Sequence, residues 1–170
     1  DTSEVREMAW TFAGCLEFNQ NIGMWDTSKV TRMEGMFEGA VRFNQPLNDW
    51  DVSNVRYMLR MFDGAKSFNQ PLDKWNVGRV EDAERMFKKA RSFSQPLDTG
   101  LIPRFCDVSN MFLYAPKFTD VKTLTLCFHL STKKSCRARL KEKLDKLDPA
   151  EVYAELSRYG SEHTAEYMRE

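Results

Sequence analysis

The sequence predicts an α/β repeat solenoid, in which each coil contributes one short strand and one short helix and the last coil is covered by helices. The first observation is a 25-residue pattern that recurs without gaps over residues 1–100. The second is a helix-spaced set of apolar residues within each copy, and the third is a helical composition near the C-terminus. We divide the chain into residues 1–118, four full copies and one degenerate copy, and residues 119–170, a C-terminal cap of one short strand and two or three helices.

Aromatic and small residues recur at a constant phase of the pattern, which marks them as candidate core. The clearest column is Phe12, Phe37, Phe62, Phe87 and Phe112. The other columns are Phe18, Phe43, Phe68, Phe93 and Phe118, then Cys15, Ala40, Ala65, Ala90 and Ala115, then Trp25, Trp50 and Trp75. One copy alone cannot offset the entropy of ordering its backbone, so neighbouring copies must stack.

Within the second copy, Val30, Met33, Phe37 and Ala40 have helical spacing. Ser28 is a plausible N-cap and Gly39 a plausible left-handed C-cap, so we expect a helix from about Ser28 to Glu38. The following stretch, which contains Leu47, Trp50 and Val52, is expected to form a short strand.

The pattern W-D-V-S-N-V-x-x-M-x-x-M-F-x-G-A-x-x-F-N-Q-x-L, read from Trp50 onward, resembles the surface-protein repeat family related to the BspA-like leucine-rich repeats. The resemblance covers residues 1 to about 118. It implies leucine-rich-repeat-like coils with one strand and one short helix per turn, and a recognition role on a cell surface or after secretion. It brings no catalytic residues.

The columns that vary between copies are the candidate contact positions. Trp10, Leu16 and Met24 are apolar where later copies are mostly charged, which indicates either a docking surface or a surface covered by a preceding segment of the chain. Basic residues align in two of these columns, and tyrosines also lie in the tail. The remaining candidate partner-binding residues are therefore Arg60, Lys66, Arg85, Arg91, Tyr153 and Tyr159.

A polar pair also recurs, as Asn19-Gln20, Asn44-Gln45, Asn69-Gln70 and Ser94-Gln95. Stacked amides can hydrogen-bond along a repeat array and satisfy turn backbone, so a structural ladder is expected. A glycan-binding row is the alternative.

The tail has a helical pattern after a last predicted strand at Leu124–Phe128. Leu140, Leu144 and Leu147 mark a helix from roughly Thr132 to Leu147, Asp148-Pro149 starts a second that ends at Gly160, and Ser161 caps a third that reaches Tyr167. These helices either cover the end of the solenoid or form a docking arm for another subunit.

Composition narrows the function classes. Lys+Arg and Asp+Glu both number 25, so a general nucleic-acid surface is not expected. No apolar run reaches membrane-spanning length, and neither a signal peptide nor an N-glycosylation sequon is visible. The resemblance therefore favours a surface or secreted location, whereas these absences favour an intracellular, organellar or viral assembly.

No motif predicts an enzyme, a cofactor or a metal site. Cys127, His129 and Cys136, with His163 as a remote fourth residue, match no common zinc spacing, and Cys127 could instead be a buried apolar residue or pair with Cys136. We therefore expect a non-catalytic scaffold, structural subunit or docking module of a larger assembly that binds protein. The alternative is a surface or secreted recognition or adhesion module that binds protein or glycan.

Overall fold

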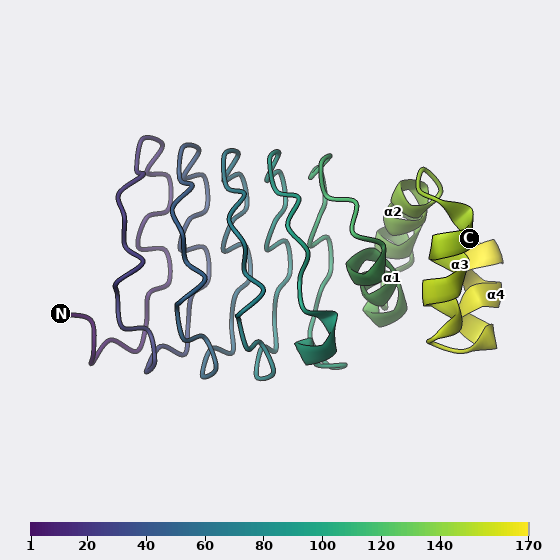
Figure 1. The fold of residues 1–170 in the computed structure, drawn as a ribbon, viewed down its shortest axis with the longest axis horizontal. Coiled ribbons are helices and arrows are strands. Elements are labelled where there is room, and N and C mark those ends of the chain that lie inside the picture. Colours follow the sequence, from purple (N-terminus) through teal and green to yellow (C-terminus); the bar gives the residue numbers. More distant parts are fainter. Residues whose placement is uncertain (170) are drawn as a thin grey trace.

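The computed structural model describes residues 1–169, apart from the side chain of His163. The chain forms a row of similar coils that ends against a group of helices (Figure 1). We name the coils by their residues: coil 1 is 1–25, coil 2 is 26–50, coil 3 is 51–75, coil 4 is 76–100 and coil 5 is 101–118. The helices are η1 (Thr99–Leu101), α1 (Val121–Leu130), α2 (Lys134–Leu144), α3 (Pro149–Ser157) and α4 (Ser161–Arg169).

The predicted α/β solenoid, with leucine-rich-repeat-like coils of one strand and one helix, is wrong. Within the described residues the coils contain turns, isolated parallel bridges and the single 3-10 turn η1, but neither a strand nor an α-helix. The bridges join one residue of each coil to its equivalent in the next: Glu7 to Arg32, Arg32 to Tyr57, Tyr57 to Asp82, and Asp82 to Asp107. All α-helix lies after residue 120.

The helix expected from Ser28 to Glu38 does not form because left-handed residues interrupt it. Gly35 and Gly39 have φ angles of 55° and 70°, and Arg60 and Arg85 take the same conformation at the Gly35 position of later coils. An α-helix requires a continuous right-handed backbone, so a left-handed residue every few positions leaves only single turns. Ser28 is not an N-cap either, since it donates its N–H and hydroxyl to the Asp26 carboxylate at 3.0 and 2.6 Å.

The N–H groups at alternate positions, released from helical bonding, donate to the next coil. Those of Met33, Gly35, Phe37 and Gly39 reach carbonyl oxygens of coil 3 at 2.7–2.9 Å. The N–H groups of Met36, Glu38 and Ala40 instead donate to the carbonyl three residues earlier and close β-turns inside coil 2. Coils are therefore joined by a backbone ladder, and each apolar residue at turn spacing points inward as it would from a helix.

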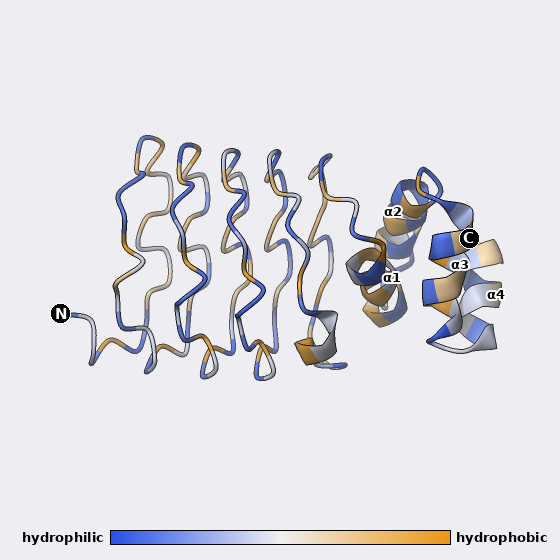
Figure 2. Ribbon diagram, viewed as in Figure 1, coloured by the Kyte–Doolittle hydropathy of each residue, from blue (hydrophilic) through white to orange (hydrophobic). Residues whose placement is uncertain are grey.

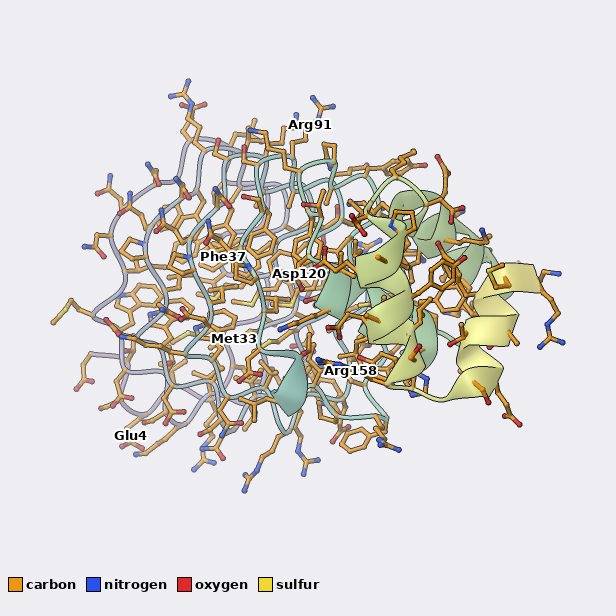
Figure 3. All side chains as sticks on the ribbon, turned by 45° about the vertical axis from the view of Figure 1, so that its right-hand side comes forward. Glu4, Met33, Phe37, Arg91, Asp120 and Arg158 are labelled. Atoms are coloured by element: carbon orange, nitrogen blue, oxygen red, sulfur yellow. The ribbon has the colours of Figure 1, made fainter. Side chains whose placement is uncertain are left out.

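The core is a stack of aromatic rings that follows the axis of the coils. Phe37 lies 5.4 Å from Phe62, which lies 5.5 Å from Phe87, with interplanar angles of 10° or less. All three rings are fully buried, and Figure 3 places Phe37 and Met33 inside the stack. Hydrophobic and hydrophilic residues alternate along each coil, as Figure 2 shows, because only one side of the backbone faces this core.

The strand expected around Leu47 to Val52 is also absent, although its apolar residues are buried. Leu47, Trp50 and Val52 are at most 3% exposed. The Trp50 indole N–H donates to the carbonyl of Ile22 at 3.2 Å, and that of Trp75 donates to the carbonyl of Leu47 at 2.9 Å. Each tryptophan thus ties its coil to the one before it.

The last predicted strand, Leu124–Phe128, is wrong as well, because these residues lie in α1. The Asp120 carboxylate caps this helix by accepting the Thr123 N–H at 2.8 Å. Residues 123–128 are all buried, so the alternation of Leu124, Leu126 and Phe128 with smaller residues did not mark two faces of a strand. The three later helices occupy the expected places, with α2 shorter than predicted.

Candidate interaction surfaces

Coil 1 exposes the apolar residues that the sequence singled out. Met24 is 94% exposed, Leu16 56% and Trp10 47%. Trp10 also has a structural role, because a Cβ atom on Gly35 would stand 1.9 Å from its ring. The ring therefore covers the glycine of coil 2, and Leu16 and Met24 are the freer side chains.

Coil 1 also presents an unpaired edge of the backbone ladder. In coil 2 the carbonyls of Arg32, Glu34, Met36 and Glu38 accept N–H groups of coil 1 at 2.7–2.9 Å. The equivalent carbonyls in coil 1, which accept no backbone hydrogen bond from the described residues, belong to Glu7, Ala9, Thr11 and Ala13. An unpaired backbone acceptor row is a template for further polypeptide.

The aromatic stack reaches the surface at the same edge. Phe12, Phe18 and Trp25 are only partly buried, whereas Phe37, Phe43 and Trp50 in coil 2 are at most 3% exposed. Phe12 and Phe18 stack with their ring centroids 3.8 Å apart. The outer face of coil 1 therefore combines apolar rings with backbone acceptors.

The predicted amide ladder is confirmed by the hydrogen bonds. The side-chain oxygen of Asn19 accepts the backbone N–H of Asn44, Asn44 accepts that of Asn69, and Asn69 accepts that of Ser94, each at 2.9 Å. Glutamine side chains add bonds to the same oxygens, as from Gln45 at 3.0 Å. These amide oxygens satisfy turn backbone, and a glycan-binding role for the row stays a prediction.

The basic candidates divide into paired and unpaired residues. Arg60 lies 3.4 Å from Glu38 and Arg85 lies 3.1 Å from Glu84, so their charges are partly compensated within the stack. Lys66 and Arg91 are exposed, and neither forms an ion pair in the part of the chain that the structure describes. Figure 3 shows Arg91 at one edge of the stack and Glu4 at the other.

The tail tyrosines are brought into the packing of the helices. Tyr159 stacks on His129 with ring centroids 4.6 Å apart, and burial raises its pKa. Tyr153 is 38% exposed and meets Tyr167 edge to face at 6.2 Å. Tyr153 can therefore contact a partner, whereas Tyr159 belongs to the packing between α1 and the end of α3.

The cysteines are unbridged, so Cys127 and Cys136 are not paired. Burial raises the pKa of Cys106 to about 12 and also raises that of Cys127, so neither thiol is a ready nucleophile. Among the described residues no three His, Cys, Asp or Glu side chains gather as a metal site, and the side chain of His163 lies outside them.

Sequence reasoning missed Lys143 on α2, which reaches the last coil. Its ammonium donates to the carbonyl oxygen of Ala115 at 2.8 Å and to that of Phe118. Burial, followed by the nearby charge of Lys146, lowers its pKa to about 8. Only the docking of α2 on coil 5 creates this environment, so no local motif could reveal it.

A protein family described as "Mycoplasma protein of unknown function, DUF285" matches residues 1–100, more than half of the chain. The protein therefore belongs to this family. Neither the curated proteins nor the solved structures contain a match. No helix in the described part of the chain is long and apolar enough to cross a bilayer.

Proposed function

We propose that the protein is a non-catalytic interaction module that docks a protein partner on the outer face of coil 1. The observation that carries this proposal is the exposure of Leu16 and Met24 at positions where coils 3 and 4 are polar or charged. Leu16 corresponds to Lys66 and Arg91, and Met24 corresponds to Lys74 and Thr99. Large exposed apolar side chains are typical of protein contacts.

The backbone of the same face supports a polypeptide partner over a small molecule. Its free carbonyls repeat the row that binds a neighbouring coil throughout the stack. A partner that offers N–H donors along an extended edge would continue this ladder, while Leu16 and Met24 would add apolar contact area. Since a lone carbonyl row binds weakly, the exposed side chains would supply much of the affinity.

The native mass of the protein from its source tests the proposal. We expect it to migrate with a partner, and the double variant Leu16→Lys, Met24→Lys, which copies the residues of coil 3, to migrate alone. The matched control Lys66→Leu, Lys74→Met places the same apolar side chains on coil 3 and should leave coil 1 binding intact. A wild-type protein that migrates alone, or a double variant that still migrates with its partner, would overturn the proposal.

A surface or secreted recognition module is the second candidate, and the resemblance to BspA-like surface repeats supports it. The two candidates differ in the cellular location at which the protein binds its partner, and both use the same face of coil 1. Labelling of intact cells with a membrane-impermeant amine reagent separates the two. Lys66 and the other exposed lysines would react on a surface protein and would be spared on an internal one.

A further inference from the structure

A cavity of about 380 Å³ lies between coil 5 and α2, at the end of the stack opposite coil 1. One wall is formed by residues of coil 5, and the facing wall is formed mainly by residues of α2. This volume is in the range of sites for small organic molecules.

The coil wall carries a row of unpaired N–H donors. In coil 4 the N–H groups of one row donate to carbonyls of coil 5 at 2.8–3.0 Å; they belong to Ala83, Arg85, Phe87 and Lys89. One repeat further on, the same row is formed by Val108, Asn110, Phe112 and Tyr114. None of these four N–H groups donates a hydrogen bond to another described residue, and all four residues line the cavity.

Two of the four donors are deeply placed, which makes their lack of a partner costly. Val108 and Phe112 are each 3% exposed. A buried N–H group without an acceptor is unfavourable, because it has given up hydrogen bonds to water. The row therefore favours an occupant that supplies oxygen acceptors.

The facing wall has a positive balance. Three cations of α2 and its end, Arg139, Lys143 and Lys146, line the cavity against one carboxylate, Glu142. Lys146 lies 3.1 Å from Glu142. The Arg139 guanidinium donates one hydrogen bond to the side-chain oxygen of Asn110 at 2.9 Å. Arg139 keeps further guanidinium donors, because only one is used by Asn110.

The remaining lining is apolar and includes Met111, Leu113 and Leu140. An occupant must therefore combine anionic oxygens with an apolar body. Lys143 is already bonded to two carbonyl oxygens. The free positive charge thus suits a single carboxylate better than a doubly charged phosphate.

We propose that this cavity binds a small amphipathic carboxylate, whose oxygens accept hydrogen bonds from N–H groups within the row of coil 5 and from the Arg139 guanidinium, while its apolar body contacts Leu113 and Leu140. The proposal is independent of the docking face on coil 1, because the two surfaces lie at opposite ends of the stack. The proposal assigns a class of ligand to the coil 5 end of the stack, where the repeats alone would leave a row of N–H donors without acceptors.

Titration of the ¹⁵N-labelled protein with octanoate tests the proposal residue by residue. We expect saturable amide shifts at Val108, Asn110, Phe112 and Tyr114. The paired amides of Ala83 and Phe87, which occupy the same row one coil earlier, should not move. 1-Octanol, which has the apolar body without the carboxylate, should bind at least about tenfold more weakly.

Two variants locate the charge and the volume. Arg139→Gln should weaken octanoate binding about tenfold and leave 1-octanol unchanged, and Leu140→Trp should abolish both by filling the cavity. Arg91→Gln, an exposed arginine on the stack edge, is the matched control and should bind octanoate as the wild type does. Should Leu140→Trp not fold, Arg139→Gln decides.

Three results would overturn the proposal: no shift in these amides at millimolar octanoate, equal affinity for octanoate and 1-octanol, or unchanged affinity in Arg139→Gln. The first would mean that water alone satisfies the N–H row. A failure of docking on coil 1 would leave these outcomes untouched, so the two proposals fail separately.

Discussion

Replacement of Phe62 by alanine tests whether the aromatic stack holds the coils together. The Phe62 ring is fully buried and lies 4.1 Å from Phe68, 5.4 Å from Phe37 and 5.5 Å from Phe87. The coils on both sides are fixed by backbone bonds, so they cannot collapse into the space that the ring leaves. We therefore expect a loss of about 3–5 kcal/mol in the free energy of unfolding.

The matched control is Phe12→Ala, which removes the same side chain from the same column of coil 1. Phe12 is only partly buried and has a neighbouring coil on one side, with Phe37 at 5.7 Å. Phe12→Ala should lower the free energy of unfolding by about 2 kcal/mol, because the Phe12 ring buries less area on folding and the open side of coil 1 can relax around the smaller residue. Arg60→Ala keeps a non-glycine residue at φ 55° and loses only the contact with Glu38, so it should change stability by less than about 1 kcal/mol.

Urea unfolding followed by tryptophan fluorescence measures all three variants. A change in midpoint at constant slope reports stability alone, whereas a changed slope would mean that the array no longer unfolds as one unit. Equal costs for Phe62→Ala and Phe12→Ala, or a cost below about 1 kcal/mol for Phe62→Ala, would refute the continuous stack.

Three further outcomes follow from the backbone and the buried groups. Lys89 has a φ angle of 59° at a position where coil 3 has Gly64 at 75°. In the same urea assay, Lys89→Gly should therefore stabilise the protein by roughly 0.5–1 kcal/mol, and Gly64→Ala should destabilise it by about 1 kcal/mol. The opposite signs would contradict the left-handed assignment. Asn44→Ala removes the acceptor of the Asn69 N–H at 2.9 Å and should lower the free energy of unfolding by about 1–3 kcal/mol. Asn44→Asp keeps an acceptor and should lower it by less. Equal losses for the two variants would mean that the amide ladder is not a source of stability. Burial raises the pKa of Cys106 from 9.0 to about 12, so the contribution of this thiol to stability is present below pH 9 and is lost as the pH rises toward 12. Above pH 9 the free energy of unfolding of the wild type should therefore fall more steeply than that of Cys106→Ala, by about 1.4 kcal/mol per pH unit. Parallel profiles would exclude this thiol as the cause.

The core could be predicted from the sequence, because its evidence is the repetition itself. A side chain that recurs at constant phase must occupy equivalent places in stacked coils, so the Phe37 column was assigned to the core correctly. The amide ladder from Asn19 to Ser94 was predicted for the same reason. These inferences need the period of the repeat and not the conformation inside it.

The conformation inside each repeat could not be derived from spacing. Met33 and Phe37 are four residues apart, which fits one helical turn and equally fits successive β-turns that return the side chain to the same side. Only Gly35 and Gly39 signal left-handed backbone in coil 2, whereas Trp10, Arg60 and Arg85 take that conformation without any glycine. Tertiary packing against the next coil, not local propensity, holds them there.

The two ends of the stack differ because the backbone ladder has a direction. Along the row that begins at Met8, the N–H groups donate to the following coil and the carbonyls between them accept from the preceding one, whereas the flanking bonds from Thr31 to Arg6 and from Arg42 to Leu16 run the other way. Along this one row, coil 1 therefore ends in acceptors and coil 5 ends in donors. The acceptor row belongs to coil 1, which also exposes Leu16 and Met24, and the donor row is covered by α2 and its cations. A polypeptide edge suits the first chemistry and a carboxylate suits the second, so the polarity of one ladder accounts for both proposed sites.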